Sequence, residues 1–228
     1  MHPEQRRHSF GVGYQGVEFP DGIWVPPVPK AGNGQADDVR DIWQTMQVSR
    51  TTWVGSEVAD LGCNTGYFGI RALRAGAKSC LFGDLNAEAV SSARSIYKSW
   101  KSSGHPMGEA QFVHGDMERW FPGKKRTLDA VFLHQVIYHL AHPIPFLRCI
   151  RDALRPGGIF YMWTRIAVNV HEKHWEWVPN LDTMERTLFY VGFSTVTFHG
   201  PRDRLRDIGG FLGGSDKGQR KVLVVATR

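Results

Sequence analysis

Four residues between Asp60 and Gly66 have the types and the spacing to hold a ligand. Asp60, Gly62, Asn64 and Gly66 lie between an apolar segment and a segment whose apolar residues have helical spacing. In open α/β sheets, ligands bind at the carboxyl ends of the strands, so a loop in this position is where a cofactor would lie. The alternative is a glycine turn that serves only to reverse the chain.

The residues of this loop discriminate between cofactors. A dinucleotide fingerprint needs glycine where Asn64 and Tyr67 stand, and a Walker phosphate loop needs a Gly-Lys-Ser/Thr sequence that does not follow here. A cofactor without pyrophosphate tolerates a looser loop, in which Asp60 could face a cationic amino group and the two glycines let the backbone pass close to the ligand. This describes the methionyl half of S-adenosylmethionine.

Two more carboxylates follow the next two predicted strands. Asp84 comes roughly twenty residues after the glycines, the distance expected for an acid that accepts both ribose hydroxyls. Asp116 could accept from an adenine amino group, with Met117 packed on the ring. Each acid alone could be a turn residue. Three acids at three successive strand ends predict a nucleoside site, in which we also include Leu85.

The elements that must position these residues alternate between strand and helix patterns. Helices are expected at about 36–49, where Asp37 or Asp38 can cap, and at 67–75, 87–101, 145–154 and 181–190. Strands are expected at 56–61, 79–83, 111–114, 128–133, 158–164, 194–198 and 222–226. The alternation predicts an α/β fold with a doubly wound, seven-stranded, mostly parallel sheet.

The first 35 residues have a different pattern. They are rich in Gly and Pro, with short extended pieces around 17–19 and 23–25 and no helical period. We therefore expect residues 1–35 to form an N-terminal extension or lid, and residues 36–228 to form one domain.

Composition limits the cellular setting and the partners. The formal charge of +6 and the pI near 9.4 favour an acidic or phosphate-bearing partner, but basic and acidic residues are mixed along the chain. Three cysteines in apolar surroundings indicate reduced core thiols. Neither a signal peptide nor an apolar run long enough to cross a bilayer is evident, so we expect a soluble cytoplasmic protein without a membrane partner.

On these motifs the chain resembles the class I S-adenosylmethionine-dependent methyltransferases. DLGCNTGYF resembles their first motif, FGDLNAEAV the second, HGDM the adenine-binding turn, and LRPGGIFYM the turn before the fifth strand. The similarity runs over about 57–164, with VGFSTVTF and KVLVVATR resembling the terminal strands. GCNTGYF and the upstream YQGVEFPDGIW are similar to a subgroup that includes the bacterial tRNA uridine carboxymethyltransferase and many small-molecule methyltransferases. The resemblance implies a Rossmann-like methyltransferase fold and S-adenosylmethionine as cofactor; Asn64 replaces the glycine commonest there.

Methyl transfer is an in-line displacement, so the protein must align the nucleophile and remove its proton where one is present. The sequence LHQVIYHL after the fourth predicted strand supplies His139 as the candidate general base, His134 as a cofactor contact and Tyr138 as a substrate contact. Alternatively, these histidines orient side chains or cap a helix. With His142 they could form a metal cluster, but the spacing fits no common metal motif, so we expect no metal.

Substrate contacts are also expected from connections and from the extension. Arg165, which leaves the fifth strand, could meet a carboxylate or phosphate of the acceptor, or only a surface acid. Tyr14, Trp24 and Trp175 could roof a substrate pocket, or they could seal the edge of the core.

The leading hypothesis is methyl transfer to an oxygen, nitrogen or sulfur of a small-molecule acceptor. The second is a tRNA- or RNA-modifying (carboxy)methyltransferase, suggested by the net charge and by the basic residues of 124–126 and 202–221. Two other nucleic-acid methylation chemistries are disfavoured: LHQVIY after the fourth predicted strand is not the Asn/Asp-Pro-Pro-aromatic run used for base amino methylation, and none of the three cysteines follows proline, as the nucleophile for carbon methylation of pyrimidines typically does. A cofactor-binding regulator without catalysis and a nicotinamide oxidoreductase are the third and fourth alternatives.

Overall fold

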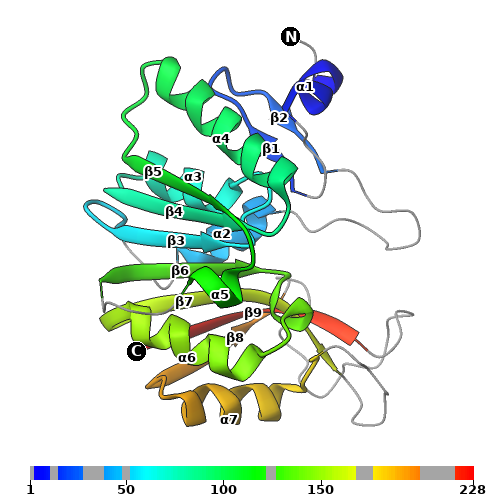
Figure 1. Ribbon diagram of the computed structural model, residues 1–228, viewed down its shortest axis with the longest axis vertical. Coiled ribbons are helices and arrows are strands. Elements are labelled where there is room, and N and C mark those ends of the chain that lie inside the picture. Colours follow the sequence, from blue (N-terminus) through cyan, green and yellow to red (C-terminus); the bar gives the residue numbers. More distant parts are fainter. Residues whose placement is uncertain are drawn as a thin grey trace. The chain divides into compact units, whose positions relative to one another are not determined.

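The computed structural model describes residues 3–10, 15–27, 39–47, 52–121, 127–167, 177–200 and 219–228, without the side chains of 7–9 and 219–220. The chain forms two compact units, residues 1–120 and 121–228. Figure 1 shows their helices and strands. Within the described ranges, the helices are too short or too polar to cross a bilayer.

The first unit is built around three parallel strands. Strand β4 pairs with β3 on one side and with β5 on the other, in register from Glu57 opposite Ser79 to Asp84 opposite His114. These strands and the helices that follow them are β3 (Glu57–Leu61), α3 (Tyr67–Arg74), β4 (Ser79–Asp84), α4 (Ala87–Ser102), β5 (Glu109–His114) and α5 (Met117–Trp120). The N-terminal part supplies α1 (Pro3–Phe10), the antiparallel pair β1 (Val17–Glu18) and β2 (Trp24–Val25), and α2 (Val39–Met46).

Helix α4 shows how local sequence fixes the ends and the buried face of an element. Its cap residue Asn86 accepts a hydrogen bond from the Glu88 N–H at 2.8 Å, which satisfies one of the free donors at the helix start. Its buried face carries apolar residues at helical spacing: Val90, Ala93, Ile96, Tyr97 and Trp100. This face packs against β4 and β5.

The second unit contains one parallel and two antiparallel strand pairs. Strands β6 and β7 are parallel, and β9 pairs antiparallel with both β7 and β8. Its elements are β6 (Leu128–His134), the 3-10 helix η1 (Ile137–His139), α6 (Pro143–Ala153), β7 (Leu154–Ala167), α7 (Leu181–Val191), β8 (Thr195–His199) and β9 (Gln219–Thr227). Proline at the start of α6 and left-handed Gly192 after α7 fit their positions at helix ends.

The predicted fold class is confirmed, because seven described strands form a mostly parallel sheet with flanking helices. The predicted strands and helices from 56 to 226 recur within a few residues of their expected bounds. Two details differ. The expected turn at 155–158 is a bulge inside β7, since Leu154 already pairs with Leu128 before the regular ladder starts at Ile159. Residues 3–10 form a helix that the Gly- and Pro-rich pattern did not predict.

Helix α3 approaches β4 closely at Gly69. A Cβ atom there would lie 2.3 Å from Cε1 of Phe82 and 2.6 Å from Sγ of Cys80. Helix propensity alone favours alanine over glycine by about 1 kcal/mol. We nevertheless expect Gly69→Ala to lower the free energy of unfolding, by about 1–3 kcal/mol, because of overpacking. Urea denaturation measures this, with the exposed helix position Ser91→Ala as control. A stabilised Gly69→Ala protein would contradict the packing described.

Candidate cofactor site

The loop between β3 and α3 has a backbone that depends on left-handed residues. Gly62, Asn64 and Gly66 have φ values of 70°, 49° and 77°. Asparagine tolerates this region better than most residues with a side chain. At Gly66, a Cβ atom would also lie 3.1 Å from both Ala93 and Phe82. Glycine at 62 and 66 and asparagine at 64 therefore suit the left-handed backbone of this turn, whereas bulkier residues at these positions would be strained.

The loop is hydrogen-bonded to the end of β4. The backbone N–H groups of Gly62 and Cys63 donate to the Gly83 carbonyl at 2.8 and 3.0 Å. The Asn64 N–H donates to Oδ2 of Asp84 at 2.9 Å. The other oxygen of this carboxylate accepts from the Asn86 N–H at 2.9 Å. Because a carboxylate offers about four acceptor sites, each oxygen of half-buried Asp84 can accept a further hydrogen bond.

Asp60 at the end of β3 is a fully buried carboxyl group. Its Oδ2 accepts from the Gly69 N–H at 2.9 Å, and its Oδ1 has no hydrogen-bond partner among the described residues. Burial raises the pKa of Asp60 to about 7; the Gly69 hydrogen bond opposes this rise and the negative charge of Asp84 adds to it. A buried acceptor without a donor is a place where a ligand donor fits.

The adenine side of the predicted site follows β5. Asp116 precedes α5, where its Oδ1 accepts from the Glu118 N–H at 3.0 Å and its Oδ2 lies 3.3 Å from Arg119. Its side chain is 42% exposed. Met117 is buried, whereas Leu85, after β4, is 68% exposed despite being apolar. The predicted cofactor residues of the first unit thus gather at the carboxyl ends of three adjacent strands: Asp60, Gly62, Asn64, Gly66, Asp84, Leu85, Asp116 and Met117.

The second unit gathers a separate polar cluster at the carboxyl ends of β6 and β7. Tyr138 is buried; its hydroxyl donates to Oε1 of Gln135, and the Arg165 guanidinium lies 4.8 Å from its ring centroid. The ring of exposed His139 packs edge-to-face with Tyr138, with 4.4 Å between the two ring centroids. His134 ends β6, opposite Trp163 of β7. Sequence reasoning missed Gln135, whose left-handed φ of 58° has no glycine to announce it.

The other predicted substrate residues have different outcomes. Tyr14 and Trp175 lie outside the described residues, as do the candidate caps Asp37 and Asp38. Trp24 packs within the first unit, with the Arg40 guanidinium 4.4 Å from its ring and Tyr67 edge-on at 6.0 Å. Its role in substrate binding stays a prediction. The described residues contain no group of three or more His, Cys, Asp or Glu placed to hold a metal ion.

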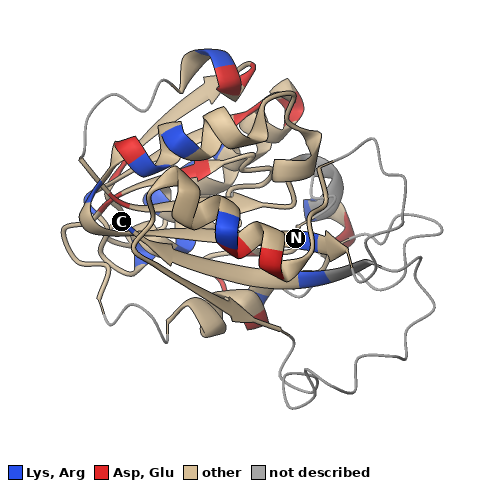
Figure 2. Cartoon of the chain, turned by 90° about the horizontal axis from the view of Figure 1, so that it is seen from below, with Lys and Arg blue, Asp and Glu red and all other residues tan. Residues whose placement is uncertain are grey.

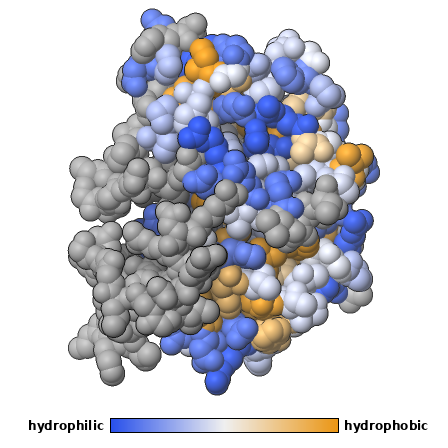
Figure 3. All heavy atoms as spheres, turned by 180° about the vertical axis from the view of Figure 1, so that it is seen from behind, coloured by the Kyte–Doolittle hydropathy of each residue, from blue (hydrophilic) through white to orange (hydrophobic). Residues whose placement is uncertain are grey.

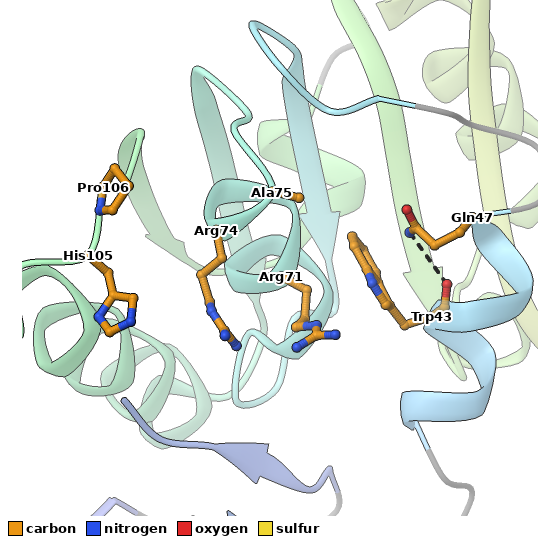
Figure 4. Close-up of a pocket in the computed structure, with 7 residues that line it drawn as sticks. All are labelled: Trp43, Gln47, Arg71, Arg74, Ala75, His105 and Pro106. Carbon is orange, nitrogen blue, oxygen red and sulfur yellow. Dashed lines mark hydrogen bonds between the residues drawn. The ribbon is translucent and has the colours of Figure 1, made fainter. Parts of the chain in front are cut away.

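A hollow on the first unit is distinct from the glycine loop (Figure 4). It lies beside the C-terminal half of α3 and is lined by Trp43, Gln47, Arg71, Arg74, Ala75, His105 and Pro106. Both arginines point toward it in Figure 4, and both already bind the same Oε2 of Glu18, at 2.7 and 2.6 Å. We assign this hollow a structural role.

Residues 59–162 match the family described as methyltransferase domain. The match spans the loop and all three carboxylates of the first unit. Together with the fold, this match confirms the resemblance to the class I S-adenosylmethionine-dependent methyltransferases and the cofactor inferred from the sequence.

Among curated proteins, the chain is similar to the tRNA U34 carboxymethyltransferase of Methylococcus capsulatus. The two are 30% identical over 127 residues, which are 54% of this chain and 36% of the relative. Relatives of the same name in other bacteria are matched over between 33% and 51% of their length. The chain therefore spans about a third to a half of these proteins.

Solved structures show the same fold at low identity. The [4+2]-cyclase SpnF superposes with a TM-score of 0.68 at 15% identity, over 99% of this chain and 92% of that chain. Phosphoethanolamine N-methyltransferase 2 of Haemonchus contortus, in complex with phosphomonomethylethanolamine and S-adenosylhomocysteine, superposes with a TM-score of 0.65 at 16% identity, over 86% and 55% of the two chains. Because one neighbour is a cyclase, the shared fold alone does not determine the reaction.

The raised pKa of Asp60 predicts a pH dependence of stability. The native carboxyl holds its proton up to about pH 7, whereas the unfolded chain releases it near the ordinary value of 3.8. The unfolded state therefore binds fewer protons between these values, and Asp60 makes the free energy of unfolding fall as the pH rises, by up to about 1.4 kcal/mol per pH unit.

Asp60→Asn is expected to remove this contribution, which is measured by comparing urea denaturation of the variant and the parent from pH 4 to pH 7.5. The exposed helix position Asp182→Asn is the control, and its difference from the parent should not change with pH in the same way. Parallel curves for Asp60→Asn and the parent would contradict the buried, protonated state.

Proposed function

We propose that this chain transfers a methyl group from S-adenosylmethionine to an oxygen, nitrogen or sulfur of a small-molecule acceptor. The observation that supports this best is the alignment of Asp60, Asp84 and Asp116 at the carboxyl ends of three adjacent parallel strands, beside the left-handed loop. That arrangement offers acceptors for an ammonium group, a ribose and an adenine in the order in which the cofactor presents them.

The residues of the first unit fit such a ligand. The amino group of the cofactor is the kind of donor that Oδ1 of Asp60 lacks. Asp84 can accept the ribose hydroxyls with the lone pairs that its two backbone hydrogen bonds leave over. Asp116 accepts from the adenine amino group, while exposed Leu85 offers apolar surface to the ring. When bound, the cofactor supplies a methyl group already activated by its sulfonium centre.

The residues predicted to act on the acceptor lie within the second unit, at the carboxyl ends of β6 and β7. His139 carries an exposed imidazole, the side chain best suited to accept a proton near neutral pH, and Tyr138 holds it by an edge contact. Arg165 carries a positive charge on the face of Tyr138 and would bind an anionic group of the acceptor. We propose that His139 removes the proton of the acceptor and that Tyr138 and Arg165 orient the acceptor. His134, at the end of β6, is assigned to the cofactor.

A second candidate function is modification of tRNA. It is favoured by the name shared by the curated relatives, tRNA U34 carboxymethyltransferase. Charge distribution does not favour it, because basic and acidic residues are interspersed along the described helices and strands (Figure 2). Where Figure 3 colours its face, apolar groups are scattered among hydrophilic residues. The basic segments 124–126 and 202–218 lie outside the described residues.

One experiment separates these functions. Protein supplied with methyl-labelled S-adenosylmethionine is offered a small-molecule extract and, separately, total tRNA, and S-adenosylhomocysteine is quantified. Label in the small-molecule pool supports the first candidate. Label in tRNA, with a transfer rate that falls steeply with salt, supports the second. Cofactor binding without S-adenosylhomocysteine from either pool would contradict methyl transfer to both classes of acceptor.

The site residues predict a division between binding and transfer. Asp84→Ala removes the anchor of Asn64 and the proposed ribose contact, so we expect affinity for S-adenosylhomocysteine to fall by about a hundredfold. His139→Ala should leave that affinity unchanged and slow transfer by about 10²- to 10⁴-fold. Calorimetry and single-turnover kinetics measure the two effects. Normal transfer by His139→Ala would remove this residue as the base.

A further inference from the structure

The glycine loop is contacted from the N-terminal side by a buried side chain. The Thr65 hydroxyl donates to Oε1 of Gln15 at 3.1 Å, and both residues are nearly inaccessible, 1% and 2% exposed. Fifty residues separate them in the sequence. A buried hydroxyl without an acceptor is costly, so this hydrogen bond constrains both partners.

Thr65 is the central residue of the strained part of the loop. It stands between left-handed Asn64 and Gly66, and its own N–H donates to Oδ1 of Asn64 at 2.9 Å. On the other side of the loop, Asp84 holds the Asn64 N–H. The turn is therefore fixed from β4 by a carboxylate and from the N-terminal segment by an amide.

The segment that carries Gln15 is itself anchored to the helices of the first unit. The Glu18 carboxylate binds Arg71 and Arg74 on α3. The backbone carbonyl of Glu18 accepts a hydrogen bond from Nε1 of Trp100 on α4 at 3.0 Å. Burial alone would raise the pKa of Glu18, but Arg74 and Arg71 together lower it. Next to Gln15, Gly16 leaves room for the Trp24 ring, which a Cβ atom would meet at 2.2 Å. These contacts anchor the segment around Gln15 and so hold its side chain beside the loop.

We propose that Gln15 is a positioning residue for cofactor binding: it holds Thr65, and through Thr65 it keeps the Asn64–Gly66 turn in the conformation that accepts S-adenosylmethionine. The inference rests on the proposed function. Residues 15–19 form the anchored segment that carries Gln15, and Gln15 acts on the cofactor loop through the Thr65 hydroxyl.

The test is a double-mutant cycle read as affinity for S-adenosylhomocysteine by calorimetry. Gln15→Ala and Thr65→Val are each expected to weaken binding by about tenfold. The double variant should be no weaker than either single variant, because both remove the same hydrogen bond. Thr65→Ser keeps the hydroxyl and should bind like the parent.

The matched control is Gln47→Ala. Gln47 also accepts a hydrogen bond from a buried partner, Nε1 of Trp53 at 3.1 Å, but it lies beside the hollow of Figure 4 and has no hydrogen bond to the loop. The Gln47→Ala substitution should lower thermal stability and leave the affinity for S-adenosylhomocysteine within twofold of the parent. Should Gln15→Ala not fold, Gln15→Met, which keeps the side-chain length, replaces it.

The outcomes separate this inference from the proposed function. A parent protein that does not bind S-adenosylhomocysteine would overturn both. If the parent binds, this inference alone is overturned by any of three results: unchanged affinity in the Gln15 variant, additive effects of the Gln15 and Thr65 substitutions, or an equal loss of affinity in Gln47→Ala.

Discussion

The hydrogen bond from the Asn64 N–H to the Asp84 carboxylate is the constraint on which the candidate site depends. It joins the turn after β3 to the end of β4 and stabilises a left-handed residue that has a side chain. Without it, the backbone between the two glycines would lose the contact that offsets its conformational cost. The same carboxylate also accepts from the start of α4, so the loop, the strand end and a helix terminus share one acceptor group.

The fold was predictable because most of its elements have strong local signals. The apolar runs of β3 and β6, the cap Asn86 and the left-handed Gly192 are all visible as residue types at fixed spacing. Helix α1 was not predictable, because its helical face carries little apolar periodicity and its contacts, such as Phe10 against Phe19, come from tertiary packing. The bulge in β7 was read as a turn because Pro and Gly signal both in the same way.

The residues of the candidate site likewise fall into those that local sequence signals reveal and those that only tertiary packing brings together. Asp60, Asp84 and Asp116 could be found because strand ends can be inferred, and a parallel sheet brings them to one edge. Gln15 and Glu18 could not, since an amide and a carboxylate in a Gly- and Pro-rich segment carry no periodic signal. Their partners, Thr65 on the loop and two arginines on α3, lie about fifty residues away and are reached only through packing. Gln135 escaped notice for a related reason, because its backbone conformation is set by bonding to Trp163.

The anchoring of Glu18 to Arg71 and Arg74 has a consequence for how the protein senses its solution. Salt affects apolar packing little, whereas the contact of the Glu18 carboxylate with two partly exposed guanidinium groups is electrostatic. Mobile ions screen such attractions at physiological ionic strength and more strongly above it. The ionic medium therefore acts on one defined contact of the segment that carries Gln15, and Gln15 and Thr65 would carry that influence to the ligand-binding turn.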